Sequence, residues 1–451
     1  MDDFVKEIDL LVEESQKALK TLVTFDQEKV DSIVKALSGA GLENAEKLAK
    51  AAFDETGMGV YEHKIQKNQA AAGAVYDFMK DKKSVGIIGE ENGVYEVAEP
   101  YGVVAAAVPV THPTATTIFK SLIALKGRNA IIFAFHPRAQ KSSAAAAQIM
   151  LDAALAAGAP KGCIQWIDNP SIEKTNYLMK HRNVSLIVAT GGGALVKAAY
   201  SSGHPCLGVG PGNVPVYVEK TANLPMMVNC TIASKTWDNS TPCSSESVLI
   251  FDDALVAESA KKLFIDKGAY FCSSQEKSQL INVMFDKEKG VVAAQAVAQS
   301  PHKIAELAGM TIPNETKILI VPIDSIGPTD YMSHEKLSPV LAWYQTANKD
   351  EAIKAAIDVL EFGGAGHTAA IYSKNDEILR EFGVAVPANR VVFNQPSGPG
   401  SIGAYNPQIA PTFTLGCGSR GGNSVSENVT YRHLLNIKKL VKRIPPESID
   451  E

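Results

Sequence analysis

The 451-residue sequence has no long run of apolar residues and no block of one charge. Its longest apolar candidate, residues 144–159, is interrupted by Gln148 and Asp152, whereas a bilayer-spanning helix needs roughly 18 or more apolar residues. The net charge of −5 and the absence of a Lys/Arg-rich run argue against binding to a nucleic-acid backbone. We therefore expect neither a membrane nor a nucleic acid as a partner.

Signals for secretion and for metal binding are also missing. Residues 1–10 carry acidic side chains where a signal peptide would be basic and then apolar. The cysteines are scattered along the chain: Cys163, Cys206, Cys230, Cys243, Cys272 and Cys417. They form no CxxC pair and no zinc-type spacing with histidine. This pattern is typical of reduced thiols, so we expect a cytoplasmic enzyme without disulfides or a bound metal.

What is present has the balance of a folded globular protein, with 45% hydrophobic and 21% charged residues. Residues 4–22, 30–37 and 45–52 show the 3.6-residue apolar period of one-sided helices. After residue 99, short β-branched or alanine-rich runs alternate with helical segments. Strands are predicted at 103–108, 130–135, 163–167, 186–189 and 214–218. Helices are predicted between them at 116–126, 142–157, 171–180 and 194–202. This alternation predicts a parallel, doubly wound α/β sheet of Rossmann type.

A second α/β set follows Trp237, with strands predicted at 247–251, 317–321, 369–372 and 390–394. The composition changes near Asp238. We therefore predict an N-terminal helical and cofactor-binding domain at 1–237 and a catalytic domain at 238–415. The tail from Pro396 is rich in Gly, Ser and Asn, which predicts a functional or oligomer-contacting loop region. Its last segment, 416–451, is expected to return to the cofactor domain as a small oligomerisation element.

Two features point to a nucleotide. The apolar run 186–188 leads into Ala-Thr-Gly-Gly-Gly, and Gly191 and Gly192 would let a phosphate approach the backbone at the start of a helix. This is not the G-x-G-x-x-G fingerprint, so a plain strand-to-helix turn is the alternative. Arg138 follows the strand 130–135 at the edge where open α/β sheets bind ligands. We expect Arg138 either to contact a ribose or phosphate of the nucleotide or to form a surface salt bridge.

Cys243 lies in a polar loop, Trp-Asp-Asn-Ser-Thr-Pro-Cys-Ser-Ser-Glu (237–246), directly before a predicted strand. A reactive thiolate needs partial exposure and a local source of positive potential. Such a thiolate adds to an aldehyde carbonyl, and the oxyanion then needs hydrogen-bond donors. Hydride transfer to a nicotinamide would leave a thioester on Cys243. The alternative is a small, inert core residue.

Several long strings resemble the CoA-acylating branch of the aldehyde dehydrogenase superfamily. They are Glu-Thr-Gly-Met-Gly-Val-Tyr-Glu (55–62), Glu-Pro-Tyr-Gly-Val (99–103), Lys-Ala-Ala-Tyr-Ser-Ser-Gly (197–203), His-Glu-Lys-Leu-Ser-Pro (334–339), Gly-His-Thr (366–368) and Leu-Gly-Cys-Gly-Ser (415–419). The resemblance is strongest to the N-terminal half of bifunctional aldehyde–alcohol dehydrogenases and to acylating succinic-semialdehyde dehydrogenases. It implies that family's fold, NAD or NADP as cofactor, CoA as co-substrate, and a homodimer or larger homo-oligomer.

The resemblance also implies roles for single residues. Cys243 matches the family nucleophile, and Glu335 matches the glutamate that holds the nicotinamide ribose. Gly191 and Gly192 match the cofactor-facing turn, and Gly210 is assigned to the cofactor side of the site. His367 matches a histidine typical of the acylating branch. We interpret it as handling the CoA thiol proton, with a loop histidine of purely structural role as the alternative.

One absence separates acyl transfer from hydrolysis. Hydrolytic family members carry Glu-Leu-Gly-Gly-x-Asn, whose glutamate activates water, and the matching stretch here is Gly-Val-Gly-Pro-Gly-Asn (208–213). Gly208 therefore replaces the general base, a loss worth about 10²–10⁴ in rate. CoA is the implied acyl acceptor. A hydrolytic dehydrogenase and an inactive scaffolding relative are the alternatives, and the intact Cys243, Glu335 and His367 argue against the second.

Four positions depart from the acetaldehyde-type pattern. His112 stands where the family has an asparagine that donates to the oxyanion, and Thr241 and Pro242 replace aliphatic residues before the cysteine. Arg420 replaces a tryptophan. A polar site with a cation suits a two-carbon aldehyde with an anionic head, such as sulfoacetaldehyde, with acetaldehyde and succinic semialdehyde as alternatives. On this interpretation Thr241 and Arg420 contact the substrate; otherwise Arg420 faces solvent or a neighbouring subunit.

Overall fold

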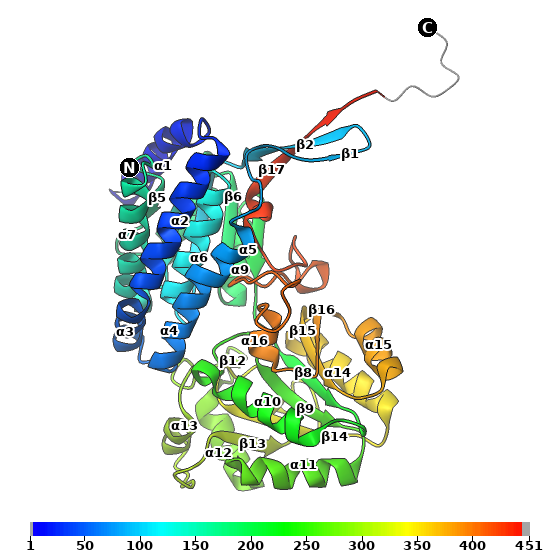
Figure 1. The fold of residues 1–451 in the computed structure, drawn as a ribbon. Helices are drawn as coiled ribbons and strands as arrows, with labels where there is room; N and C mark the ends of the chain where they lie inside the picture. Colours follow the sequence, from blue (N-terminus) through cyan, green and yellow to red (C-terminus); the bar gives the residue numbers. More distant parts are fainter. Residues whose placement is uncertain (1–2, 444–451) are drawn as a thin grey trace, which may run out of the picture.

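The computed structural model describes residues 3–443. Figure 1 shows two α/β bodies and a ribbon-like arm that extends from the first of them. The chain opens with the helices α1 (Asp3–Leu22), α2 (Gln27–Glu43), α3 (Ala45–Thr56), α4 (Tyr61–Gln69) and α5 (Val75–Met79). A π-helical turn, η1 (Ala70–Ala74), joins the last two. Helices α2 to α5 pack with α6 and α7 beside the first sheet (Figure 1). Helix α1 instead packs against β3, β4 and β5 together with α8, on the sheet's other face. The one-sided burial of these helices agrees with the predicted apolar period.

The first body contains a five-stranded parallel sheet of order β5-β4-β3-β6-β7. Its strands are β3 (Val103–Val108), β4 (Ala130–Phe135), β5 (Ile164–Trp166), β6 (Leu186–Thr190) and β7 (Cys206–Val209). The connecting helices are α6 (Pro113–Lys126), α7 (Gln140–Ala156), α8 (Ile172–Lys180) and α9 (Gly193–Tyr200), with a short η2 (Pro137–Ala139). Every residue of β3 and β4 is buried, which explains their unbroken apolar sequences. The predicted parallel α/β fold is confirmed.

The second body is built on a seven-stranded parallel sheet of order β10-β13-β14-β9-β8-β15-β16. Its strands are β8 (Val214–Val218), β9 (Glu246–Phe251), β10 (Ala269–Phe271), β13 (Ile318–Pro322), β14 (Val340–Gln345), β15 (Gly366–Tyr372) and β16 (Ala388–Phe393). Its longer helices are α10 (Leu224–Thr236), α11 (Ala254–Asp266), α12 (Ser274–Met284), α13 (Pro301–Leu307), α14 (Lys349–Gly363) and α15 (Asp376–Ala385). Short elements complete it: η3 (Trp237–Ser240), β11 (Phe285–Asp286), β12 (Val291–Val292), η4 (Tyr331–Ser333) and α16 (Ser397–Ser401).

The placement of β8 differs from the sequence-based expectation. The strand lies between β9 and β15 in the second sheet, although it was predicted within the N-terminal domain 1–237. The two sheets divide between β7 and β8, which favours a boundary near residues 210–213 over one at 237/238. All five residues of β8 are buried, as in the strands of the first sheet. The apolar pattern therefore identifies a central strand but not the sheet to which it belongs.

The arm is a three-stranded antiparallel sheet. It consists of β1 (Gly86–Glu91), β2 (Val94–Pro100) and β17 (Leu435–Val441), with β17 paired along the whole of β2. β17 runs outward along this arm, from Leu435 beside Pro100 to Val441 beside Val94 at the tip (Figure 1). The segment before it contains η5 (Ser419–Gly421) and η6 (Tyr431–Leu434). Within residues 3–443, no helix is long and apolar enough to cross a membrane.

Candidate active site

The loop that carries Cys243 has an unusual backbone. It lies between α10 and β9, and Asp238, Asn239 and Ser240 all adopt positive φ angles of 49°, 51° and 61°. Aspartate and asparagine tolerate this left-handed region better than other non-glycine residues, yet such positions cost ~1–3 kcal/mol each. Strain of this kind persists only where surrounding contacts impose it, and it is common at functional sites.

Those contacts come from outside the loop. The Asp238 carboxylate accepts a hydrogen bond from the backbone N–H of Val60 at 2.7 Å and one from Lys67 Nζ at 2.6 Å. Asn239 Nδ2 donates to the carbonyl of Ala298 at 2.9 Å. The nucleophile loop of the second body is therefore fixed by the connection before α4 and by α4 itself, which belong to the first body.

Cys243 contacts His367. Nε2 of His367 lies 3.0 Å from Cys243 Sγ, and Nδ1 lies 2.9 Å from the hydroxyl of Thr368. His367 is the second residue of β15 and is fully buried, which lowers its pKa to about 3 and keeps the imidazole neutral. Burial, reinforced by the nearby Glu335 carboxylate, raises the pKa of the Cys243 thiol above its usual value. The resting pair is therefore a neutral thiol beside a neutral imidazole whose Nε2 lies within hydrogen-bond distance of Sγ.

Glu335 lies beside the same cysteine, in the connection between η4 and β14. Its Oε1 accepts a hydrogen bond from the backbone N–H of Gly212 at 3.0 Å, and burial raises its pKa to about 8. A Cβ atom on Gly212 would lie 2.1 Å from the Cys243 carbonyl oxygen, so only glycine fits there. Gly210 approaches from the same segment, and its backbone N–H faces Cys417, which packs with Val209 against Cys243.

The position of the missing glutamate is filled. Gly208 is on β7, and a Cβ atom there would meet the Tyr200 ring at 2.6 Å and a Val196 methyl at 3.1 Å. The Tyr200 hydroxyl accepts hydrogen bonds from the backbone N–H groups of Gly208 and Ser424, both at 3.0 Å. The site therefore lacks the water-activating carboxylate and has no room for one at this position.

His112 is the residue that precedes α6, in a turn that Lys64 contacts through the carbonyl oxygen of Thr111. Its Nδ1 lies 2.7 Å from the Thr111 hydroxyl, and burial lowers its pKa, so the ring is neutral. A small hollow beside it is lined by His112, Thr111 and the side chains of Lys64 and Lys67. A neutral imidazole still offers one N–H as a hydrogen-bond donor.

Apart from Glu335, the predicted cofactor residues follow the carboxyl ends of strands in the first sheet. Gly191 and Gly192 follow β6, and Arg138 follows β4, on the two sides of β3. A Cβ atom on Gly192 would meet nothing within 4 Å, and no side chain of residues 3–443 caps the start of α9. An open backbone before an uncapped helix fits the phosphates of a dinucleotide. Arg138 is exposed, on a strand end separate from the Cys243 loop.

The two tentative substrate residues have different surroundings. Thr241 is only 2% exposed, and its hydroxyl already accepts from Lys67 Nζ at 2.6 Å and donates to Asp238 at 2.9 Å. These contacts argue against a direct role of Thr241 in substrate binding. Arg420 is exposed on η5, three residues after Cys417, whose loop packs beside Cys243.

Sequence reasoning missed Arg390 on β16. Its guanidinium donates to the carbonyl oxygens of His367 at 3.2 Å and Gly416 at 2.6 Å, and so joins the strand of the base to the Cys417 loop. Reasoning from sequence also missed Lys64, Lys67 and Asp238. The i, i+3 spacing of the lysines was visible, but it is equally typical of a solvated helix face.

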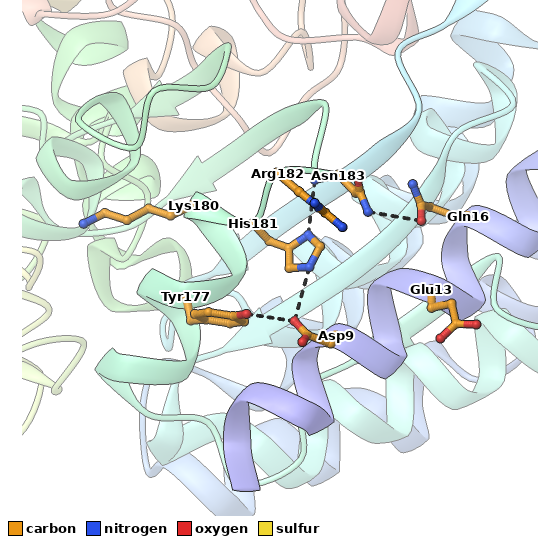
Figure 2. Close-up of a pocket in the computed structure, with 8 residues that line it drawn as sticks. All are labelled: Asp9, Glu13, Gln16, Tyr177, Lys180, His181, Arg182 and Asn183. Atoms are coloured by element: carbon orange, nitrogen blue, oxygen red, sulfur yellow. Dashed lines mark hydrogen bonds and ion pairs between the residues drawn. The ribbon is translucent and has the colours of Figure 1, made fainter. Parts of the chain in front are cut away.

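A second surface hollow, of about 560 Å³, is remote from this chemistry. It lies between α1 and the connection from α8 to β6, at the amino end of β6 (Figure 2). Its polar groups pair with one another: Tyr177 donates to Asp9 at 2.8 Å, and Asp9 also lies 3.3 Å from His181. We therefore assign the active site to the Cys243 loop.

Comparisons with known proteins agree with this geometry. The model of the "Aldehyde dehydrogenase family" matches residues 4–404. The chain is 46% identical to an aldehyde-alcohol dehydrogenase of Clostridium acetobutylicum over 97% of this chain, and it spans about half (51%) of that relative's length. It is 40% identical to a succinate-semialdehyde dehydrogenase (acetylating) of Clostridium kluyveri, over 95% of this chain and 94% of the relative.

A solved structure gives the same result. The acetylating aldehyde dehydrogenase of Geobacillus thermoglucosidasius superposes with a TM-score of 0.95 at 43% identity, covering 99% of this chain and 98% of that one. The shared fold, the match of nearly the whole chain and the cysteine with its neighbouring histidine lead to one conclusion. The chain belongs to the aldehyde dehydrogenase family.

Proposed function

We propose that the protein is an acylating aldehyde dehydrogenase. It would convert an aldehyde, CoA and NAD(P)⁺ to an acyl-CoA and NAD(P)H through a thioester on Cys243. The observation that carries this proposal is the pairing of Cys243 with a buried neutral His367, next to a Gly208 whose space is taken by Tyr200. The acetylating relatives described above support it.

In the first half-reaction, His367 Nε2 accepts the Cys243 proton as Sγ adds to the aldehyde carbon. The carbonyl oxygen becomes an oxyanion, and the His112 turn supplies a hydrogen-bond donor towards it. When bound, the nicotinamide supplies a hydride acceptor. The open turn at Gly191 and Gly192, Arg138 and Gly210 would hold the dinucleotide, and Glu335 would hold the nicotinamide ribose.

The second half-reaction transfers the acyl group to a thiol. His367 first gives the proton that it took from Cys243 to solvent. The neutral ring then accepts the proton of the CoA thiol as the CoA sulfur attacks the thioester carbon. Collapse of this adduct breaks the bond to Sγ, and the Cys243 thiolate that leaves takes the proton back from His367. Water would need a base of its own, and the Tyr200 ring occupies the space of the glutamate that provides one. A hydrolytic dehydrogenase giving a free acid is therefore the weaker candidate.

For the substrate we propose a two-carbon aldehyde, either acetaldehyde or one with an anionic head such as sulfoacetaldehyde. His112 makes the oxyanion side polar, and Arg420 is the exposed cation on the loop that packs at the cysteine. Succinic semialdehyde is the alternative, supported by the acetylating succinate-semialdehyde relative. We further propose a cytoplasmic homo-oligomer in which the β1-β2-β17 arm contacts a neighbouring subunit.

The test is a product assay with these three aldehydes, NAD⁺ or NADP⁺, and CoA present or omitted. The proposal predicts CoA-dependent NAD(P)H formation with acyl-CoA identified by mass spectrometry. Formation of free acid at the same rate without CoA would refute it. Arg420→Ala should weaken kcat/KM for an anionic aldehyde and spare acetaldehyde, and an unchanged preference would remove Arg420 from the substrate site.

A further inference from the structure

Helix α4 reaches the nucleophile loop through a buried lysine. Lys67 Nζ donates to Asp238 at 2.6 Å and to the hydroxyl of Thr241 at 2.6 Å, and the Thr241 hydroxyl closes the triangle by donating to Asp238 at 2.9 Å. The lysine and aspartate side chains are 1% and 0% exposed. The triangle ends two residues before Cys243.

The same carboxylate is linked to the opposite turn. Lys64, one helical turn earlier on α4, places Nζ 3.4 Å from Asp238 and 3.3 Å from the carbonyl oxygen of Thr111. Thr111 directly precedes His112. One helix therefore contacts both the loop that carries Cys243 and the turn that carries His112.

Several features indicate that the cluster of Lys64, Lys67 and Asp238 fixes the position of the loop rather than adding stability. Two lysines and one carboxylate leave one buried positive charge in excess, and buried ion pairs often contribute little net stability because of desolvation. The contact also requires Gly59 at φ +78°, where a Cβ atom would lie 1.9 Å from the Asp238 carboxylate. Asp238 itself begins the run of three positive φ angles. A π-helical turn follows Lys67 on the same helix, and such turns often occur at functional sites.

We propose that Lys67 and Asp238 are positioning residues that hold Cys243 at a fixed separation from the His112 turn. We call the Lys67–Asp238 contact the tether. It places Cys243 so that the oxyanion of its aldehyde adduct meets the hydrogen-bond donor of the His112 turn. Neither residue takes part in proton transfer. The inference rests on the proposed function, because the oxyanion arises from an aldehyde bound to Cys243.

Three variants separate a tether from a charge effect: Lys67→Met, Asp238→Asn and the double variant. The double variant keeps the net charge of the native cluster, because Lys64 remains, but it removes the tether. Misplacing reacting groups by about 1 Å costs about 10²-fold in rate. We expect each single variant to lose about 10² in kcat with the KM values for NAD⁺ and CoA within twofold of native. The double variant should be no worse than either single variant, because both remove one element.

The matched control is Lys50→Met on α3, which breaks an exposed Lys50–Asp54 pair of similar length, 2.7 Å. It should leave kcat unchanged, and thermal unfolding should show every variant folded at the assay temperature. Recovery of native kcat in the double variant would overturn the proposal in favour of a charge effect. Single-variant losses that multiply in the double variant, or kcat within twofold of native throughout, would also overturn it.

Thr241→Val provides the test if the charge variants do not fold, since it keeps every charge and removes only the bridging hydroxyl. The tether predicts a fall of about tenfold in kcat at constant KM for the aldehyde. An unchanged kcat in Thr241→Val would overturn the proposal. If the KM for the aldehyde rose at the same time, Thr241 would be assigned to substrate binding instead. Native protein is assayed first with aldehyde, CoA and NAD⁺. No native activity would refute the proposed function, whereas native activity with unaffected variants would refute only the tether.

Discussion

Replacing His367 by alanine should remove most of the activity without unfolding the protein. Nε2 lies 3.0 Å from Cys243 Sγ, and its burial keeps it neutral and able to accept a proton. Without it the buried thiol must ionise alone, and because its pKa lies above the usual 9.0, less than about a tenth is thiolate at pH 8. Loss of a positioned base costs about 10²–10⁴ in rate, or about 2.7–5.4 kcal/mol of transition-state stabilisation.

The assay is stopped-flow detection of NADH, which separates the first turnover from the CoA-dependent steady state. Both phases should slow in His367→Ala, because the same imidazole accepts the cysteine proton and then the CoA proton. His302→Ala, an exposed histidine on α13, is the matched control and should behave as native protein. A His367→Ala enzyme within fivefold of native kcat/KM would refute a role for this histidine as the base.

Other expectations follow from the same geometry. Alkylation of Cys243 by iodoacetamide should speed up about tenfold per pH unit from pH 7 to 9, because only the thiolate reacts and burial raises its pKa; a plateau below pH 7 would contradict this. Gly208→Glu should destabilise the protein by about 1–3 kcal/mol in denaturant unfolding, because the new side chain meets the Tyr200 ring, and should yield no free acid. Gly212→Ala should cut kcat at least about tenfold in a folded protein, since its Cβ would lie 2.1 Å from the Cys243 carbonyl oxygen; native kcat would show that the loop yields freely.

The sequence predicts the buried strands well, because their apolar residues follow one another along a single element. The strands β3 and β4 have the predicted ends, because every residue in them is buried and apolar. β3 is bounded by Gly102 and Pro109, and β4 by Asn129 and His136. The same uniform burial hid the sheet to which β8 belongs. The sequence predicts a loop-rich tail where β17 lies, because most side chains of β17 are exposed and show no buried face. The position of β17 depends on backbone pairing with β2, which the side-chain pattern does not reveal.

The candidate site could be assembled from sequence only through resemblance. Cys243 and His367 are far apart in the chain, and no periodicity indicates that their side chains meet at 3.0 Å. Lys64 and Lys67 could not be found this way, because a lysine on a helix is normally solvated. These two are buried against partners in distant segments, chiefly Asp238, which the sequence does not place beside them. The sequence shows the Thr241 hydroxyl, which suits a polar substrate, but not Lys67 and Asp238, the partners that hold it.

The central claim is that Cys243 carries the acyl group and gives it to CoA. Intact-protein and peptide mass spectrometry after mixing the enzyme with aldehyde and NAD⁺, without CoA, tests this directly. The account predicts an acyl mass on the peptide containing Cys243, about one equivalent of NADH, and loss of that mass to acyl-CoA when CoA is added. Continued turnover to free acid without CoA, or an unmodified Cys243 in an enzyme that produces NADH, would contradict it.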